Sequence, residues 1–148
     1  MKLLLDSSVW IEHLRAGALD AVLPALRGRF ALWMDSVVAA ELLAGCRDRR
    51  ERRVIEQLLA PFERSGRVAA PSHGDFRRAA AALSALRSRG KTPGSPGGAL
   101  LDALIVAVAR RIGAMVVSAN VRDFEALAGP LAVTFHPLGA FVTSLRHR

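Results

Sequence analysis

The sequence predicts an α/β domain with a mainly parallel central sheet. Short apolar runs typical of buried strands alternate with longer segments of helical periodicity. Of the 148 residues, 51% are hydrophobic, which is enough to build a core and excludes a disordered chain. Neither an internal repeat nor a break in composition divides the chain, so residues 1–148 are expected to form a single domain.

The elements of the first half follow from apolar runs and their capping residues. Asp35 or Ser36 can cap a helix that reaches about Ala44 and stops at Gly45. Pro61 is expected to end the charged helix that precedes it. The predicted strands are residues 3–5, 31–34 and 67–70, and the predicted helices are residues 9–14, 20–26, 36–44 and 48–59.

The second half contains the most apolar helix of the chain, expected over residues 99–112 and buried on nearly all sides. Ser72 is expected to cap a helix over residues 72–89, where apolar residues recur at helical spacing. The glycines and prolines of residues 90–98 predict a flexible loop. The remaining elements are strands at residues 115–118 and 132–135 and a short helix at residues 121–127.

The net charge of +8 indicates a polyanionic partner such as nucleic acid. Nearly all of the positive charge is arginine, because Lys2 and Lys91 are the only lysines. The arginine-rich residues 47–53 can follow an RNA backbone. The interleaved Asp48 and Glu51 equally favour ion pairs within a solvated helix.

Cysteine usage and hydropathy indicate a cytoplasmic protein. Cys46 is the only cysteine, so an internal disulfide is excluded, and no Cys/His cluster has zinc-site spacing. The apolar start is interrupted by Asp6 before a signal peptide can develop. The longest apolar run, residues 103–109, is too short for a membrane span.

Two carboxylates stand where burial is expected. Asp6 directly follows the first predicted strand, and the carboxyl ends of parallel strands form the ligand crevice of open α/β sheets. A helix cap is the alternative role for Asp6. Glu41 lies inside the apolar run of residues 37–44, so it is either on an exposed helix face or held by a partner.

Asp102 is the only charge between Lys91 and Arg110, near the start of the most apolar helix. Helix stabilisation through the macrodipole is one explanation, and a nearby cation is the other. Asn120 and Asp123 follow the strand at residues 115–118, and either can instead cap the next helix. Oxygen-bearing side chains converging in this way predict a site for Mg²⁺ or Mn²⁺.

Four segments in this order resemble the motifs of the PIN domain, and more narrowly those of VapC-like toxins from type II toxin–antitoxin pairs. They are residues 4–12 (LLDSSVWIE), 41–45 (ELLAG), 101–107 (LDALIVA) and 117–124 (VSANVRDF). The resemblance spans almost the whole chain. It departs from the family at Asn120, where many relatives have Asp, and in the Gly/Pro-rich segment before the third motif, which affects substrate access.

The resemblance implies a three-layer α/β/α fold and a site for Mg²⁺ or Mn²⁺. It implies that the catalytic and metal-binding residues are Asp6, Glu41 and Asp102. Four further side chains would support them: Ser8, Ser118, Asn120 and Asp123. Whether Asn120 or Asp123 completes the site, and whether one or two metals bind, stays open.

The activity implied is the hydrolysis of RNA phosphodiester bonds, with neutralisation by a cognate VapB-like antitoxin and assembly as a homodimer. Apolar residues on the helices of residues 9–26 are expected to be exposed and to form an interface. A receiver-type phosphoacceptor is disfavoured because no second acid stands beside Asp6, and a haloacid-dehalogenase-like phosphatase would need an acid at Ser8. A non-catalytic PIN relative is the stronger alternative, although Asp6, Glu41 and Asp102 are all present.

Overall fold

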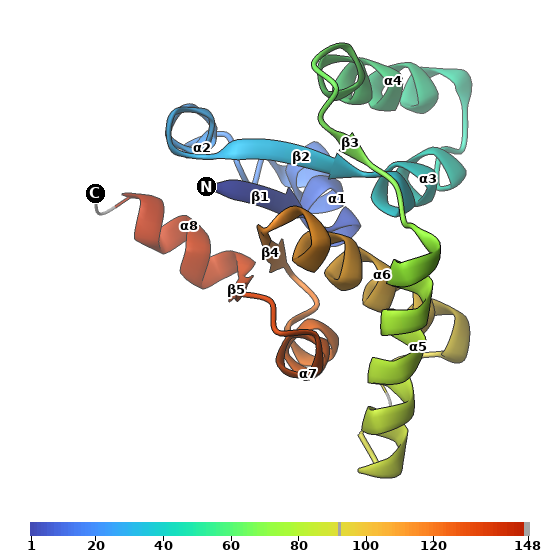
Figure 1. The fold of residues 1–148 in the computed structure, drawn as a ribbon. Helices are drawn as coiled ribbons and strands as arrows, with labels where there is room; N and C mark the ends of the chain where they lie inside the picture. The colour runs from blue at the N-terminus through green and yellow to red at the C-terminus, as the bar shows by residue number, and fades with distance from the viewer. Residues whose placement is uncertain (92, 147–148) are drawn as a thin grey trace.

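The computed structural model describes residues 1–91 and 93–146, and within them the chain forms five strands and eight helices (Figure 1). The strands are β1 (Lys2–Leu5), β2 (Ala31–Asp35), β3 (Val68–Ala69), β4 (Ala114–Ser118) and β5 (Phe135–Pro137). The helices are α1 (Ser7–Ala16), α2 (Leu23–Arg29), α3 (Ser36–Ala44), α4 (Arg49–Arg64), α5 (His73–Ser88), α6 (Pro96–Ile112), α7 (Val121–Leu131) and α8 (Leu138–Arg146).

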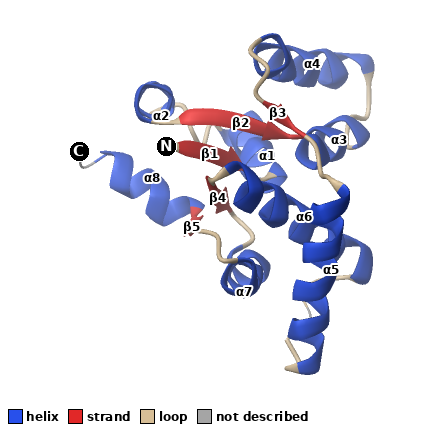
Figure 2. Cartoon of the chain, in the orientation of Figure 1, coloured by secondary structure: helices blue, strands red, loops and turns tan. Residues whose placement is uncertain are grey.

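The five strands form one parallel sheet in the order β3-β2-β1-β4-β5. The chain therefore moves one way across the sheet from β1 to β3 and then crosses back to β4 and β5. Because crossovers between parallel strands are right-handed, α1 to α4 cover one face and α5 to α7 cover the other (Figure 2). The predicted three-layer α/β/α fold is confirmed.

The core lies around the two central strands and α6. Leu3, Leu4, Val116 and Val117 are fully buried, and each of residues 103–109 on α6 is at most 3% exposed. This burial explains why α6 is apolar on nearly all sides, as the sequence predicted. None of the helices in the described ranges combines the length and the apolarity that crossing a bilayer requires.

The helix caps predicted at Asp35 and Ser72 are confirmed. Asp35 caps α3 by accepting a hydrogen bond from the Val37 amide at 2.7 Å. Ser72 caps α5 and forms a reciprocal capping box with Asp75. These bonds satisfy amide groups that have no partner inside the helix.

Pro61 does not end α4, contrary to the sequence prediction, since the helix continues to Arg64. The proline falls in the last turn, where only one turn of helix follows the missing amide donor. The residue after it, Phe62, packs edge-on against Trp10 with 6.0 Å between ring centroids. Burial of this aromatic pair favours the extra turn.

The predicted loop at residues 90–98 is shorter than expected because α6 begins at Pro96. Ser95 caps the helix by accepting from the Gly98 amide at 3.3 Å, and proline suits the first helical position because it lacks an amide hydrogen. The glycines at 97 and 98 are therefore helical. Thr92 lies outside the described residues, so the predicted flexibility of this loop stays a prediction.

Other boundaries shift by a few residues. The helix expected at 20–26 begins only at Leu23, with Pro24 in its first turn, and β3 has two residues instead of four. Helix α7 runs four residues longer than expected, which moves the last strand to Phe135–Pro137. Helix α8 was not predicted, although its buried Leu138, Phe141 and Leu145 have helical spacing.

Candidate active site

The strand order places a topological switch point at the carboxyl ends of β1 and β4. The direction of travel across the sheet reverses between these neighbouring strands, and such a switch point is where open α/β sheets bind ligands. Asp6 follows β1, and its amide donates to the Val117 carbonyl of β4 at 3.0 Å. Ser118 ends β4 and is fully buried. The first and fourth sequence motifs are thus joined at this edge.

Asp6 is only 3% exposed and is held by hydroxyl groups from both strands' ends. Its Oδ2 accepts from Ser8 Oγ at 2.7 Å, from Ser118 Oγ at 2.9 Å and from the Ser8 amide at 3.4 Å. Within the described residues, its Oδ1 accepts only from Ser7 Oγ, at 3.5 Å. Asp6 therefore caps α1 and also lies at the switch point, so its cap role is confirmed and its role as a ligand stays a prediction.

Ser8 and Ser118 can each donate to Asp6, and their two hydroxyl oxygens lie 3.3 Å apart. Ser8 Oγ accepts from the Ala119 amide at 3.1 Å, and Ser118 Oγ accepts from the Asn120 amide at 2.9 Å. Each hydroxyl thus accepts from the backbone after β4 and donates to the same carboxylate oxygen. Since Asp6 Oδ2 is saturated, Oδ1 is the oxygen that remains for a ligand.

Glu41 lies on α3, half-buried, and its Oε2 is buried with no hydrogen-bond partner among the described residues. Burial raises the pKa of this carboxyl, the nearby Ser7 hydroxyl opposes the rise, and the charge of Asp6 adds to it. An orphaned carboxylate oxygen facing other acids is costly without a cation or proton. The exposed-face alternative for Glu41 is therefore wrong.

Asp102 is the seventh residue of α6, not a first-turn residue as its place in the sequence suggested. The macrodipole acts within the first turn, so helix stabilisation does not explain this acid. The pKa of Asp102 is raised to about 7, mainly by burial and further by the charges of Asp6, Glu41 and Asp123. Electrostatically, the four acids form one cluster.

Asn120 and Asp123 have different positions in this cluster. Asn120 Nδ2 donates to Asp123 Oδ2 at 3.1 Å, so the amide holds the carboxylate, and only Asp123 acts on the pKa of Asp102. Gly94 lies against Asp123: a Cβ there would come within 3.3 Å of Asp123 Oδ2. The segment before α6 therefore borders the site. Ser7 lies in the first motif and Gly94 in the Gly/Pro-rich segment, but neither was assigned a role at the site from the sequence.

The donor set suits a hard divalent cation. It consists of carboxylate oxygens, one of them orphaned in Glu41 and one nearly free of donors in Asp6. In residues 1–91 and 93–146, however, no three His, Cys, Asp or Glu side chains lie close enough to hold one ion together. Shared ligation requires inward movement of these carboxylates.

The family model of the PIN domain matches residues 3–130. The chain belongs to the PIN domain family. PIN domains are nucleases and generally use divalent metals. The match covers all four motifs on which the resemblance rested, so the family assignment made from the sequence is confirmed. No curated protein matches the chain.

Solved structures share the fold of this PIN domain. FitAcB from Neisseria gonorrhoeae is 22% identical, with a TM-score of 0.70, over 93% of this chain and 98% of that one. DNA-bound VapBC from Salmonella typhimurium is 19% identical, with a TM-score of 0.70 and the same coverage. VapBC2 from Rickettsia felis, bound to a promoter DNA fragment, is 17% identical with a TM-score of 0.72, also over 93% and 98%.

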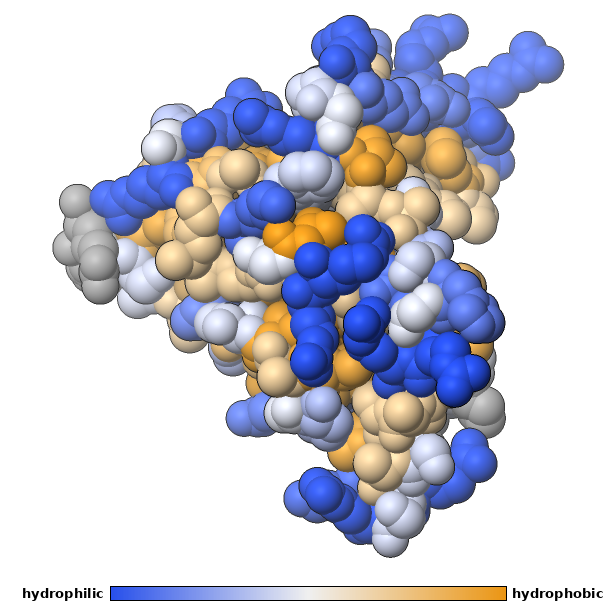
Figure 3. All heavy atoms as spheres, in the orientation of Figure 1, coloured by the Kyte–Doolittle hydropathy of each residue, from blue (hydrophilic) through white to orange (hydrophobic). Residues whose placement is uncertain are grey.

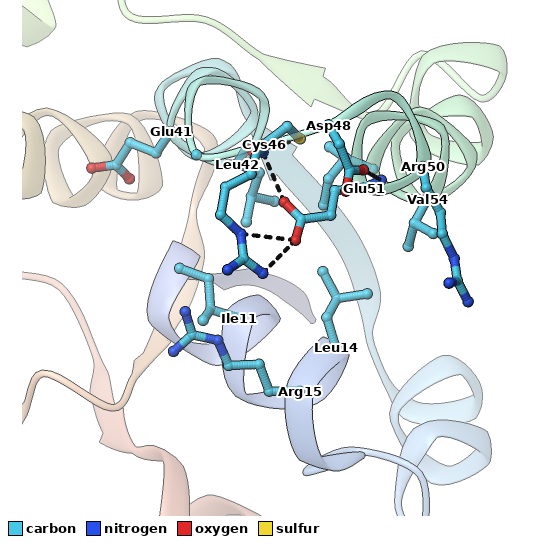
Figure 4. Close-up of a pocket in the computed structure, with 13 residues that line it drawn as sticks. Ile11, Leu14, Arg15, Glu41, Leu42, Cys46, Asp48, Arg50, Glu51 and Val54 are labelled. Carbon is cyan, nitrogen blue, oxygen red and sulfur yellow. Dashed lines mark hydrogen bonds and ion pairs between the residues drawn. The ribbon is translucent and has the colours of Figure 1, made fainter.

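A groove of about 530 Å³ leads away from Glu41 between α1, α3 and α4 of the PIN domain (Figure 4). Ile11, Leu14 and Val54 line it and are 37%, 42% and 42% exposed. In Figure 4 the Glu41 carboxylate points away from these apolar side chains. Of the large apolar residues at 9–26, only Ile11 and Leu14 are exposed, and the others are buried or half-buried in the core. The expected interface is therefore smaller than the sequence suggested, and it stays a prediction.

Hydrophilic side chains cover the region of α4 on the face shown in Figure 3. Two ion pairs agree with the solvated-helix interpretation of the arginine-rich segment: Arg47, just before α4, with Glu51 at 2.6 Å, and Arg52 with Glu56 at 3.5 Å within the helix. Asp48 caps α4 instead of forming an ion pair. The remaining arginines of this segment, at 49, 50 and 53, are exposed. The PIN domain therefore presents positive charge along α4, beside the groove.

Proposed function

We propose that this PIN domain is a divalent-metal-dependent endoribonuclease of the VapC-like type, acting as a single domain over residues 1–148. The observation that carries the proposal is the convergence of charge at Asp102. Three acids from different elements, Asp6, Glu41 and Asp123, act on its carboxyl and raise its pKa. A structural acid would not need three like charges as neighbours, whereas a cation site does.

Asp6, Glu41 and Asp102 are the residues that we assign to hold Mg²⁺ or Mn²⁺. Such a cation would make a water molecule more acidic and neutralise charge at the scissile phosphorus. Ser8 and Ser118 fix Asp6, as outer hydrogen bonds commonly orient metal ligands. The orphaned Oε2 of Glu41 serves as a ligand or as the acceptor of the proton from the attacking water.

Asp123 completes the acidic cluster in this proposal, and Asn120 positions it. The amide of Asn120 can donate but carries no charge, so it holds the Asp123 carboxylate without adding repulsion. Exposed arginines on α4 would bind phosphates of the RNA outside the cluster.

The nuclease activity is tested by incubating the purified protein with RNA and with single-stranded DNA of the same sequence. We expect RNA cleavage that needs Mg²⁺ or Mn²⁺ and stops with EDTA. D6N and E41Q should each lower the cleavage rate at least about 100-fold, consistent with loss of a ligand. The matched control is E125Q, which changes an exposed acid on α7. Equal loss in the control, or cleavage of the DNA alone, would contradict the proposal.

We also propose a cognate VapB-like antitoxin as partner, a homodimer as assembly and the cytoplasm as location. The support is the shared fold with chains of VapBC complexes, together with exposed Ile11 and Leu14 in the groove beside Glu41. If the adjacent upstream gene encodes a small protein, its co-expression with this chain should yield a complex that no longer cleaves RNA. Light scattering that finds a monomer at micromolar concentration would contradict the homodimer, and failure to co-purify would contradict the antitoxin.

A further inference from the structure

A second aspartate ends a central strand in the same way as Asp6 does. Asp35 at the end of β2 is followed by a serine and a capped helix, so that residues 35–38 (DSVV) repeat the pattern of residues 6–9 (DSSV). Asp35 is fully buried. Its Oδ1 accepts from the Val37 amide at 2.7 Å, but its Oδ2 is buried without a hydrogen-bond partner in the described part of the chain.

Asp75 on α5 is another fully buried carboxylate with one orphaned oxygen. Its Oδ2 accepts from the Ser72 amide at 2.9 Å, from Ser72 Oγ at 3.0 Å and from Arg111 Nε at 2.7 Å. Its Oδ1 is buried and has no hydrogen-bond partner among residues 1–91 and 93–146. Arg78 Nη1 lies 3.6 Å from this oxygen, outside hydrogen-bond range.

Arg111 brings the two carboxyl groups to the same end of the sheet. Asp35 pairs in register with Ala69 of β3, and the next residue, Ala70, accepts from Arg111 Nη2 at 2.7 Å through its carbonyl oxygen. The Nε of the same guanidinium binds Asp75. The end of β2, the end of β3 and the start of α5 therefore meet around one arginine.

The pKa values of Asp35 and Asp75 are shifted in opposite directions. The pKa of Asp35 is raised to about 7, mainly by burial and further by the charge of Asp75, while the hydrogen bond from the Val37 amide opposes the rise. Burial also raises the pKa of Asp75, but its bonds to Ser72 and Arg111 outweigh burial and hold the pKa below its ordinary value. Asp75 is therefore the ionised member of the pair.

We propose that Asp35 carries a proton in the folded protein and donates it from Oδ2 to Oδ1 of Asp75, and that this bond positions Glu41 by fastening the start of α3 to α5. One proton satisfies both orphaned oxygens, and a pair of buried carboxyls sharing one proton avoids two adjacent negative charges. The pair is completed by Arg111, which balances the charge of Asp75.

The positioning part of the inference rests on the proposed nuclease function. Asp35 is the N-cap of α3, and Glu41 is the sixth residue of that helix. A cap that is anchored on both oxygens restricts the tilt and rotation of a helix of nine residues. Asp35 touches no substrate in this scheme and acts through the placement of Glu41.

The shared proton is tested by thermal unfolding of the metal-free protein between about pH 5 and pH 8. Besides Asp75, the charged groups near Asp35 are Arg111 from α6 and Glu41 from α3. D35N is the informative variant because its side-chain oxygen can still accept from Val37 while its amide donates permanently to Asp75. Since the folded pKa of Asp35 is raised, the wild type loses stability as pH rises from about 4 to about 7, whereas D35N does not lose this contribution.

We expect the Tm of the wild type to fall relative to that of D35N by roughly 5–10 °C over this pH range. The matched control is D48N, since Asp48 caps α4 in the same way, accepting from the Glu51 amide at 2.8 Å, but is exposed. The Tm difference between the wild type and D48N should not change with pH. A constant difference between the wild type and D35N would overturn the shared proton.

The positioning role is tested by RNA cleavage with D35S and D35N. Serine keeps the cap on α3 but has no atom that reaches Asp75, so D35S should lower kcat about 10-fold with little change in KM, because small misplacements of catalytic groups are costly. D35N should restore the wild-type rate. Equal rates in all three proteins would overturn positioning. Absence of cleavage by the wild type would refute the nuclease proposal and leave the melting result intact.

Discussion

Replacing Asp102 with asparagine distinguishes two roles of this residue, namely a metal ligand and a purely structural acid. Asparagine keeps the size and the hydrogen-bonding ability of the side chain but removes one negative charge from the cluster. The carboxyl of Asp102 has its pKa raised from 3.8 to about 7, first by burial and then by Asp6, Glu41 and Asp123. The cost of keeping this group ionised is what the substitution removes.

The gain in stability expected for D102N follows from the pKa shift of Asp102. A shift of about three units corresponds to about 4 kcal/mol as an upper bound, and because Asp102 is only half-buried, solvent screening reduces this to roughly 1–3 kcal/mol. Since the folded pKa lies above the unfolded one, the cost appears as pH rises from about 4 and is complete above about 7. In EDTA at about pH 8, D102N should therefore melt roughly 3–10 °C above the wild type, with a much smaller difference at about pH 5.

In the presence of metal, the wild type should melt at a higher temperature than D102N, the reverse of their order in EDTA. Saturating Mg²⁺ or Mn²⁺ should raise the Tm of the wild type by mass action and leave D102N nearly unchanged. Calorimetry should show weakened Mn²⁺ binding, and RNA cleavage should be lost. The control is E125Q, whose melting, binding and cleavage should match the wild type. Full cleavage by D102N at saturating Mg²⁺, or a metal-free Tm below that of the wild type, would refute the reasoning.

Three further substitutions test the surroundings of the site. S8A removes a 2.7 Å hydrogen bond to Asp6 and should weaken Mn²⁺ affinity roughly 10-fold or more, measured by calorimetry; unchanged affinity would show that Asp6 needs no such support. G94A should destabilise the fold by roughly 1 kcal/mol in urea, because Gly94 has φ +51° and a Cβ would press on Asp123; a neutral result would mean that the segment yields freely. F124A removes a fully buried ring that stacks on Phe135 and should cost roughly 3–5 kcal/mol in the same assay, with a loss below about 1 kcal/mol contradicting the assigned core.

Local patterns predicted much of the fold because they depend on neighbours in the sequence. The apolar run of residues 3–5 can only be buried, and Ser72 caps a helix through residues three positions away. The order of elements along the chain then implied parallel strands, since a helix between two strands returns the chain to the same edge. A local signal gave the wrong helix end at Pro61, because the packing of Phe62 outweighs the missing amide donor.

The sequence by itself identified Asp6, Glu41 and Asp102 as the candidate acids of the site, because they stand within or beside apolar runs where a charge is costly. Only the tertiary structure decided how they are held. Side-chain positions depend on contacts between segments far apart in the chain, such as the bond from Ser118 to Asp6 across 112 residues. The same holds for Asp35, which looks like an ordinary helix cap in the sequence: its burial is set by β3, α5 and Arg111, and none of these lies near it in the chain.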